Sequence, residues 1–290
     1  MFYLECTHQN CHMQGFTSDG KREYMYWSFT DSLVKTNMKG TMICQIHVGG
    51  GHFGGLDWHD GKVYVSFMRY PNPWTYFTDW QAFQIYVYDD KDLRLLKIID
   101  LSECVEMKKE KRYGFQGIDG VAFGRVPGSD EMRMIVAVAL ETGEEYDHQL
   151  FLEVDEETGK IRTVYRIPAG NKVFGIQNLD YEEDTGCYWF TTYDASEPFM
   201  EKETLYCVGP DMKTVRARYA ISTPYGFEAR GNGEYVLSLQ GGVNGNQSGI
   251  AYFADAAALD RLNGKLLRPH IEPEILALAE SAVSGEKTEP

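Results

Sequence analysis

The sequence lacks the features that define several large protein classes. No apolar run approaches the roughly 20 residues of a membrane-spanning helix, and the opening MFYLECTHQNCH has neither the basic nor the apolar stretch of a signal peptide. Basic residues are few, since 28 Lys and Arg stand against 43 Asp and Glu and give a net charge of -15. A nucleic acid needs a basic surface on its partner. We therefore expect a cytoplasmic protein whose partners include neither a nucleic acid nor a membrane.

Short catalytic and metal-binding motifs are missing as well. The six cysteines form no CxxC pair, which argues against a zinc ribbon, and we expect most of them to be free thiols in the core. The chain contains no GxSxG, P-loop or HExxH motif. The glycine-rich HVGGGHFGG leads into a strand, so it lacks the helix N-terminus of a phosphate-binding loop. We expect it to let a ligand or a backbone segment approach closely.

What the sequence does contain is a repeated unit. A glycine or asparagine, an apolar residue and, in four of five copies, an acid come before a hairpin turn and a strand that alternates or runs apolar. A third strand follows in each copy, and a fourth follows in the first four. This pattern predicts an all-β fold, a five-bladed β-propeller of four-stranded antiparallel blades. The copies begin at Gly15, Gly55, Gly117, Asn178 and Gly226, and the four acids are Asp57, Asp119, Asp180 and Glu228.

The fifth copy lacks an obvious outer strand, and the sequence leaves two candidates for it. MFYLECT at the N-terminus would close the ring, and KLLRPHI near the C-terminus is the alternative. DAAALDRLNG and EPEILALAESAVSG have the composition and period of short helices. We expect a single propeller domain over residues 1–270, followed by a helical or disordered tail over residues 271–290.

Loop lengths predict where a binding site lies. In a four-stranded meander, the loop before the first strand and the loop between the second and third strands reach the same face. We call it the long-loop face and the opposite one the tight-turn face. Long loops on a rigid scaffold often carry binding sites. The long-loop face gathers amides, histidines, carboxylates and aromatics, which suit a small polar, saccharide-like ligand. The predicted ligand-binding residues are Gln14, Gln116, Gln177, Trp74, Trp80, Tyr225 and Arg112.

Histidines and carboxylates near the channel mouth suggest acid/base chemistry or metal binding. For an enzyme, we expect a hydrolase- or lyase-type reaction. A divalent metal, calcium or zinc, is a further expectation. The catalytic candidates are His12, His52, His148 and Asp57, and the candidate metal ligands are His12, His52, Asp119, Asp180 and Glu228.

Two alternatives stay open at this point. Acids and amides at repeat-matched positions often hold neighbouring blades together through hydrogen bonds, which would give them a structural role. The aromatic loop over residues 68–83 would equally suit a non-catalytic binding or interaction scaffold. The sequence decides neither whether the protein is an enzyme nor its oligomeric state.

Several short stretches resemble the propeller-type glutamine cyclotransferases. Residues 13–16, MQGF, are similar to the TQG-Φ opening of that family, and residues 32–40 to the strand that follows it. Residues 53–56, FGGL, resemble FGEG-Φ, and residues 177–181, QNLDY, resemble NELEY. The hairpins also resemble those of NHL-type and gluconolactonase-like propellers. The resemblance implies the five-bladed scaffold; the glutamate of FGEG, an acid/base group in that family, is Gly54 here.

Overall fold

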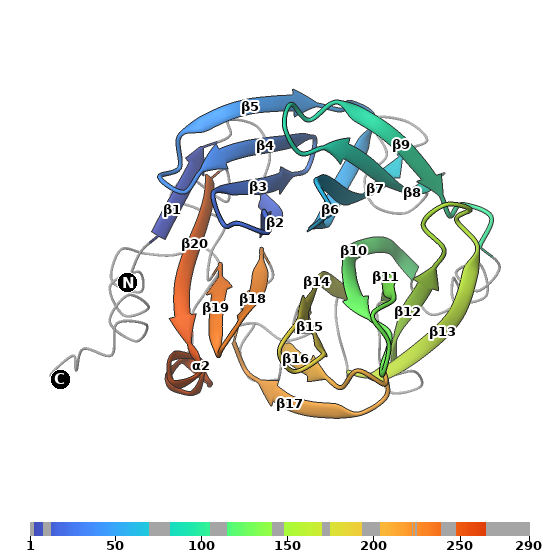
Figure 1. The fold of residues 1–290 in the computed structure, drawn as a ribbon, viewed down its shortest axis with the longest axis vertical. Coiled ribbons are helices and arrows are strands. Elements are labelled where there is room, and N and C mark those ends of the chain that lie inside the picture. Colours follow the sequence, from blue (N-terminus) through green and yellow to red (C-terminus); the bar gives the residue numbers. More distant parts are fainter. Residues whose placement is uncertain are drawn as a thin grey trace, which may run out of the picture.

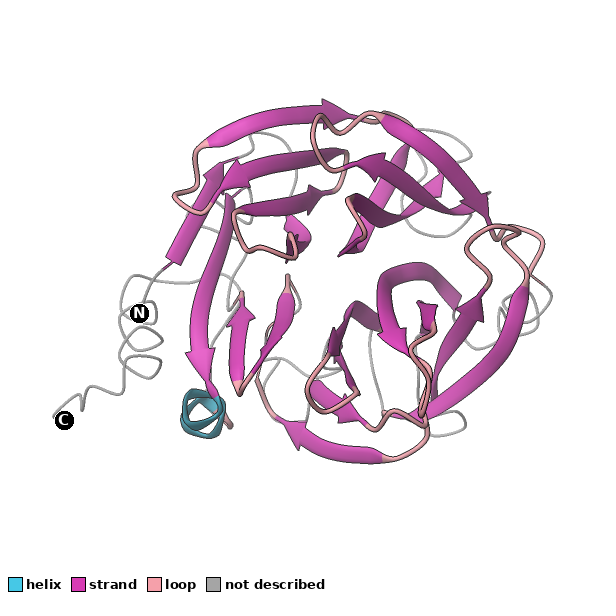
Figure 2. Cartoon of the chain, in the orientation of Figure 1, coloured by secondary structure: helices cyan, strands magenta, loops and turns pink. Residues whose placement is uncertain are grey.

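Five four-stranded antiparallel sheets stand in a ring around a central axis (Figure 1 and Figure 2). The computed structural model thereby confirms the five-bladed β-propeller predicted from the repeats. The structure describes residues 3–7, 13–69, 82–104, 115–140, 148–169, 175–192, 204–221, 223, 225–238 and 248–264.

Each of the first four blades is a meander in which consecutive strands pair, and the first strand of each blade lies innermost, against the first strands of other blades. Blade 1 contains β2 (Met13–Ser18), β3 (Tyr24–Phe29), β4 (Ser32–Asn37) and β5 (Met42–His47). Blade 2 contains β6 (Gly51–His59), β7 (Lys62–Arg69), β8 (Ala82–Asp89) and β9 (Leu95–Asp100). Blade 3 contains β10 (Phe115–Arg125), β11 (Met132–Leu140), β12 (His148–Val154) and β13 (Ile161–Pro168). Blade 4 contains β14 (Ile176–Glu182), β15 (Cys187–Thr192), β16 (Leu205–Val208) and β17 (Val215–Tyr219).

Blade 5 joins the two ends of the described chain. Its inner strands are β18 (Phe227–Gly231), β19 (Glu234–Leu237) and β20 (Ser248–Asp255). The outer strand is β1 (Tyr3–Thr7), which pairs antiparallel with β20 and closes the ring. Of the two candidates for this strand, the N-terminal one is therefore confirmed.

One described helix follows the last strand. Helix α2 (Ala256–Leu262) lies within the predicted DAAALDRLNG segment, and the Asp255 side chain caps it by accepting a hydrogen bond from Ala258 N at 2.7 Å. Its buried face packs into the apolar cluster between blades 4 and 5. The predicted boundary at residue 270 and the second predicted helix lie outside the described residues.

Apolar side chains fill the spaces between neighbouring blades. Phe53, Phe67 and Tyr86, for example, pack edge-on or tilted between blades 1 and 2, with ring centroids 4.5–6.2 Å apart. Burial of one such side chain contributes about 2 kcal/mol. Each blade has two apolar faces, and it is stable only when a neighbouring blade covers each of them. This requirement makes the sheets form a closed ring.

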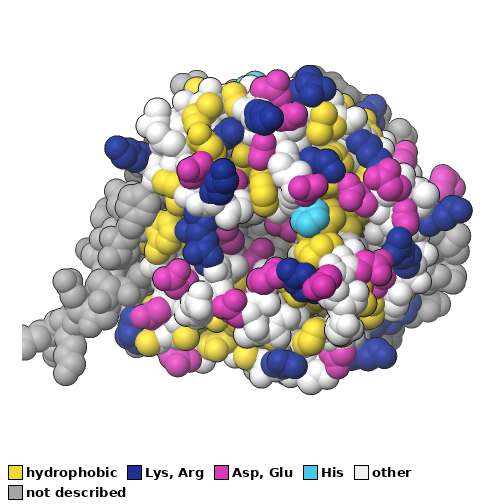
Figure 3. All heavy atoms as spheres, in the orientation of Figure 1, with side chains coloured by type: hydrophobic (Ala, Val, Ile, Leu, Met, Phe, Trp, Pro, Cys, Tyr) yellow, Lys and Arg dark blue, Asp and Glu magenta, His cyan; other side chains and the backbone are white. Residues whose placement is uncertain are grey.

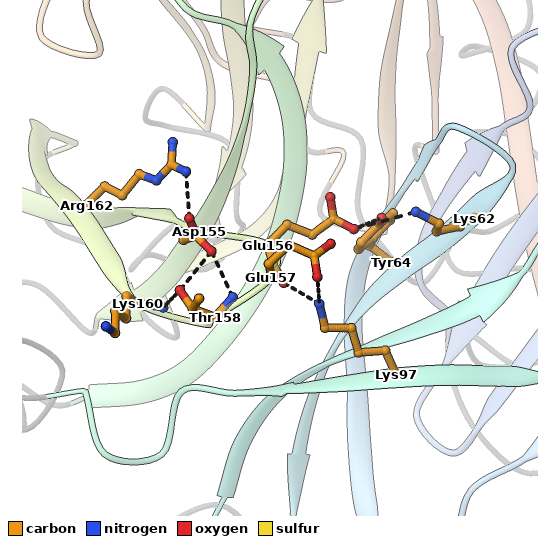
Figure 4. Close-up of polar contacts among 9 residues, drawn as sticks. All are labelled: Lys62, Tyr64, Lys97, Asp155, Glu156, Glu157, Thr158, Lys160 and Arg162. Carbon is orange, nitrogen blue, oxygen red and sulfur yellow. Dashed lines mark hydrogen bonds and ion pairs between the residues drawn. The ribbon is translucent and has the colours of Figure 1, made fainter.

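Polar contacts add connections between blades at the tight-turn face. Figure 4 shows such a connection between blades 2 and 3, where Glu156 accepts a hydrogen bond from the Tyr64 hydroxyl at 2.5 Å. Lys62 lies 3.7 Å from the same carboxylate, and Lys97 pairs with Glu157 at 3.4 Å. Partly exposed ion pairs contribute only about 0–1 kcal/mol each. Their effect is to fix how one blade is placed against the next.

Candidate functional site

Two of the three predicted glutamines, Gln14 and Gln177, occupy one structural position. The pairing of the inner strand with the second strand skips one residue at the long-loop end of β2, β10 and β14. The skipped residues are Gln14, Gln116 and Gln177, each in a β-bulge that removes it from the ladder. Gln14 and Gln177 are buried, while the side chain of Gln116 lies outside the described residues. The repeat matching is thus confirmed for Gln14 and Gln177 but is wrong for Gln116, which lies in a separate bulge of β10; by strand register, the counterpart of the other two in blade 3 is Asp119.

Gln14 and Gln177 are hydrogen-bonded to each other across the ring. Gln177 Nε2 donates to Gln14 Oε1 at 2.7 Å, and Gln14 Nε2 lies 3.4 Å from Thr30 Oγ1. Blades 1 and 4 are not neighbours in the ring, so this bond joins two blades across the axis. The two side chains are only 1% and 3% exposed. A polar contact between buried primary amides therefore lies on the axis, at the long-loop end of the inner strands.

Asn178 closes the axis next to this pair. A Cβ atom on Gly15 would lie 2.6 Å from Asn178 Oδ1, and one on Gly55 would lie 3.2 Å from the same atom. The Gly55 position is also within 3.2 Å of the Gly120 backbone. Inner strands of blades 1, 2 and 3 thus approach closely around one side chain of blade 4, which explains the glycines at positions 15 and 55. At this level the axis is filled rather than open.

Asp119 of blade 3 supplies a carboxyl group on the long-loop side of this closure. Its Oδ1 accepts a hydrogen bond from Gly55 N at 3.2 Å. A Cβ atom on Gly54 would overlap Asp119 Oδ1 and would lie 2.6 Å from Ser66 Oγ. The expectation that HVGGGHFGG permits close approach is confirmed for the backbone, since the Gln177 and Gly120 backbones lie 3.2 Å from a Cβ on Gly55; beside Gly54 it is the Asp119 side chain that fills the space.

Burial controls the protonation of Asp119. The group is 9% exposed, and its desolvation raises the pKa of the carboxyl well above the usual range, although the Gly55 N–H lowers it. Asp119 therefore keeps its proton to higher pH than an exposed aspartate does. Sequence reasoning proposed this residue only as a metal ligand.

Three other acids lie on the tight-turn side of Asn178. Each is placed beyond the repeat's glycine or asparagine along its inner strand, and each accepts a hydrogen bond from the blade that follows in the ring. Figure 3 looks onto this face, where acidic side chains lie within the central hollow. The bonds are Phe123 N to Asp57 Oδ2 at 2.7 Å, Ala229 N to Asp180 Oδ2, and Ser18 Oγ to Glu228 Oε1. These contacts support the alternative in which matched acids hold neighbouring blades together.

The three carboxyls also act on one another. Burial raises the pKa of Asp57 to about 7, against hydrogen bonds from Phe123 and Trp58 that lower it, and the charge of Glu228 raises it further. The pKa of Asp180 is raised well above its usual value, first by burial and then by the charges of Asp57 and Glu228. Like charges near one another in a desolvated place oppose simultaneous ionisation.

The predicted match of Asp119 to these acids is wrong. In β10 the pairing with β11 contains a second irregularity, so the strand holds extra residues before its tight-turn end. Phe123 N is the donor to Asp57, and the residue before it, Ala122, therefore stands where blades 2, 4 and 5 have an acid. Asp119 belongs to the bulge three residues earlier, on the other side of Asn178.

The remaining predicted site residues are spread over the fold. His52 is buried in β6, opposite Met68 and two residues before Gly54, at the long-loop end. His148 begins β12 opposite Pro168 of the outer strand, away from the axis. Tyr225 packs in the apolar cluster between blades 5 and 1. Outside the described residues lie His12, Trp74, Trp80, Arg112 and the side chain of Gln116.

The candidate metal ligands do not form one set. His52 and Asp119 lie on the long-loop side of Asn178, whereas Asp180 and Glu228 lie on the tight-turn side. Among the residues that the structure describes, no group of three or more His, Cys, Asp and Glu could hold a metal ion. His12 is outside the described residues, so metal binding stays a prediction.

Comparisons with known proteins give no family and no curated relative, since no family profile and no curated protein matches the chain. Solved structures do match at low identity. A protein of unknown function from Bacteroides caccae is 12% identical, with a TM-score of 0.40, over 72% of this chain and 82% of its own. The Dos1 propeller is 9% identical, with a TM-score of 0.46, over 93% of this chain and 63% of its own. The WD40 domain of Neurospora crassa Pan2 is 9% identical, with a TM-score of 0.44, over 90% of this chain and 66% of its own.

These likenesses concern the fold and say nothing about activity. The chain spans slightly less than two thirds of the Dos1 and Pan2 chains that it matches. The blade arrangement itself rests on the strand pairing described above. Within the described part of the chain, no helix is long and apolar enough to cross a membrane.

Proposed function

We propose that the long-loop end of the axis binds a small, uncharged, polar ligand such as a saccharide. The observation that carries this proposal is the hydrogen bond between Gln14 and Gln177. It joins two buried amides from non-neighbouring blades across the axis. Buried amides are costly unless every donor and acceptor finds a partner, and hydroxyl groups provide both kinds of partner. Asn178 fills the axis next to these amides, so a ligand at this end would enter from the long-loop side.

The charge of the site favours a neutral ligand over an ion. Burial raises the pKa of the Asp119 carboxyl well above its usual range, which favours its uncharged form. The net charge of -15 opposes the approach of an anion. The described cysteines are free thiols, which supports a reducing, cytoplasmic setting as part of the proposal.

The test is binding of matched neutral and anionic probes by calorimetry. Methyl glucoside and N-acetylglucosamine are the neutral probes, and glucuronate is the anionic control. We expect the neutral sugars to bind the wild-type protein and Gln177→Ala to weaken that binding about tenfold or more, at about 1–3 kcal/mol for a lost buried partner. Gln45→Ala, on an outer strand, should leave binding unchanged. The proposal is contradicted if glucuronate binds as well as the neutral sugars. It is also contradicted if Gln177→Ala binds the neutral sugars as well as Gln45→Ala does.

Acid/base chemistry of a hydrolase or lyase type is the finer form of this proposal. His52 lies on the inner strand β6 at its long-loop end and would act as base. In the glutamine cyclotransferases that the sequence resembles, the acid/base glutamate stands at the position of Gly54 on the same strand. Acid/base chemistry is supported in this protein by the Asp119 carboxyl, which lies beside Gly54 and comes from the neighbouring blade. His52→Gln, which keeps a polar side chain, should retain binding of the neutral sugars and abolish any turnover.

An interaction scaffold is the second candidate, and a separate observation favours it. Large apolar side chains are exposed on the outer strands of two adjacent blades, and such patches often mark contact surfaces. They are Met42 and Ile43 on β5 and Leu95, Leu96 and Ile98 on β9, with exposures of 42–58%. The aromatic loop first assigned to this role lies largely outside the described residues. Replacing Ile43 and Leu96 by Ser should abolish any self-association seen by sedimentation, while sugar binding stays unchanged.

A further inference from the structure

We propose that Cys187 and Cys207 of blade 4 form a two-coordinate site for a soft metal ion, and that copper(I) is the ion whose chemistry fits it. The site lies in the apolar cluster between blades 4 and 5, away from the axis. It is therefore independent of the ligand proposed for the long-loop end.

Strands β15 and β16 bring the two sulfurs together. Trp189 of β15 stands directly opposite Cys207 of β16, so the side chain of Cys187, two residues earlier, lies on the same face of the sheet. A side-chain hydrogen bond joins the two thiols. Both residues are buried, with exposures of 2% and 6%. Two polarizable sulfurs are thus in contact where little solvent reaches them.

The strand register favours a bridging ion over a disulfide. Cys187 and Cys207 are diagonal neighbours across the ladder, and the Cα atoms of such neighbours lie about 7–8 Å apart. A disulfide needs Cα atoms closer than about 7 Å. A metal ion relaxes this limit, because two sulfur–metal bonds of about 2.3 Å each replace one sulfur–sulfur bond of about 2.0 Å.

A guanidinium group is directed at the same pair. Arg216 is the residue that the pairing of β16 with β17 skips, so a bulge takes it out of the outer strand. Its side chain passes over Gly209, where a Cβ atom would lie 3.0 Å from Nε. Its Nη1 donates to Cys187 Sγ at 3.5 Å. A bulge and a glycine thus bring a positive charge to a cysteine two strands away.

The charges and the number of ligands fit copper(I). Binding replaces two S–H bonds by two sulfur–copper bonds and releases two protons, with no change of oxidation state. The product carries one negative charge, which the Arg216 guanidinium offsets. The described residues provide no group of three His, Cys, Asp or Glu ligands. Two sulfurs are too few for zinc, which takes four ligands, whereas soft thiolates select copper(I).

Without a metal ion, the pair remains as two thiols. Burial, and then the neighbouring Cys187, raise the pKa of the Cys207 thiol, and buried thiols in apolar surroundings react poorly. A metal ion deprotonates a coordinating thiol outright, so the ion itself creates the thiolates. Arg216 is exposed, so the sulfur that it contacts lies one side chain away from solvent.

The first experiment measures copper(I) affinity in a variant that keeps only these two cysteines. The four cysteines replaced by Ser are Cys6, Cys11, Cys44 and Cys104. Copper(I) is titrated without oxygen against a coloured chelator, and we expect one ion per chain. Adding Cys187→Ser or Cys207→Ser should weaken binding about a hundredfold or more, because a single sulfur does not chelate. Equal affinity after either replacement would overturn the inference.

The contribution of the guanidinium has a matched control on the same strand. Arg216→Gln should weaken copper(I) binding about tenfold, as loss of a group that supports a metal ligand does. Arg218→Gln, also exposed on β17, should leave the affinity unchanged. Equal affinities of the two variants would contradict the role of Arg216.

The wild-type protein provides a second measurement that does not depend on the four replacements. It should bind one copper(I) ion more than the Cys187→Ser, Cys207→Ser double variant, and thermal unfolding shows whether that variant is folded. X-ray absorption of the two-cysteine variant should show two sulfur neighbours around copper. Equal binding by wild type and a folded double variant would overturn the inference.

Oxidation separates a metal site from a redox pair. Diamide, a thiol oxidant, is added to the two-cysteine variant in its folded state and again in urea. We expect both thiols to stay free in the folded protein and to form a disulfide only after unfolding. A rapid disulfide in the folded protein would show that the strands allow the closer approach, and it would overturn the assignment as a metal site.

Discussion

Asp119 and Gly54 are complementary in size, because the carboxyl group of the first occupies the space that a side chain on the second would need. The two residues belong to different blades, so their fit fixes how blades 2 and 3 meet beside the axis. The same contact places a carboxyl where the proposed ligand lies. Substitutions of Asp119 and Gly54 should therefore affect both the stability of the fold and ligand binding.

The pair should show strong coupling in a double-mutant cycle. Gly54→Ala adds a methyl group into the Asp119 carboxyl, and overpacking of this kind costs about 1–3 kcal/mol. In an Asp119→Ala background the methyl meets no carboxyl, so the cost should fall by about 1 kcal/mol or more. Urea unfolding measures both. Gly49→Ala, with nothing within 4 Å of its Cβ, is the matched control. Additive costs would show that the two residues do not touch.

The cross-axis amide pair should act as a unit in the folded protein without ligand. Gln14→Ala leaves the Gln177 amide buried without its partner, and we expect a loss of about 1–3 kcal/mol in the free energy of unfolding. Replacing both residues by Leu removes both polar groups at once. The double variant should therefore lose less than the two single Leu variants together. A double variant as unstable as their sum would contradict the bond.

The acids on the tight-turn side should make stability depend on pH. The pKa of Asp57 is raised to about 7, so the folded protein keeps a proton that the unfolded chain releases near pH 4. Folding stability from this group is therefore present at low pH and is lost as the pH rises towards 7. Asp57→Asn removes this loss and still accepts from Phe123 N. Relative to wild type, it should gain about 1–3 kcal/mol between pH 5 and pH 8.

Unfolding in urea at both pH values measures this gain. Asp211→Asn is the control, because the pKa of Asp211 is lowered by hydrogen bonds from Thr214 and its titration is complete below pH 5. Its difference from wild type should be the same at both pH values. A pH-independent difference for Asp57→Asn would show that Asp57 ionises normally.

Ring closure should depend on β1. Deletion of residues 1–7 leaves β20 as an unpaired edge of blade 5, so we expect a lower unfolding temperature and exposure of that edge. A synthetic peptide of residues 1–10 should bind the shortened protein and restore the unfolding temperature. Proteolysis with and without the peptide is the readout. A shortened protein as stable as the full chain would contradict the closure.

The blades were predictable because turns and alternation are local signals. Asp19-Gly20 and Asn232-Gly233 mark hairpins wherever they occur, and the strands after them alternate as a sheet requires. The match of Gln14 to Gln177 was also predictable, since a bulge repeats with the strand that contains it. Gln116 was matched wrongly, because β10 has an additional bulge that the other inner strands lack. The outer strand of blade 5 was not, because the partner of Ser248–Asp255 lies at the far end of the chain.

The site was harder to predict because it depends on contacts between blades. Gly117-Ile118-Asp119 matches the repeat by letter, but β10 has a second glycine, Gly120, and the true counterpart of the acid is Ala122. The run DGVAF, which begins at Asp119, was the available signal. That Gly54 faces Asp119, and Gly55 faces Asn178, follows only from the ring itself, since no local pattern records which blade fills a missing side chain.

The pairing of β1 with β20 links the shape of the protein to the order of its synthesis. Tyr3 pairs with Tyr252, so β1 must wait for its partner strand until blade 5 has been synthesised. Blades 1 to 4 can form as they emerge from the ribosome, yet the face of blade 1 that meets blade 5 stays uncovered until blade 5 follows. A chain halted early cannot close, and its exposed apolar face would direct it to chaperones or proteases.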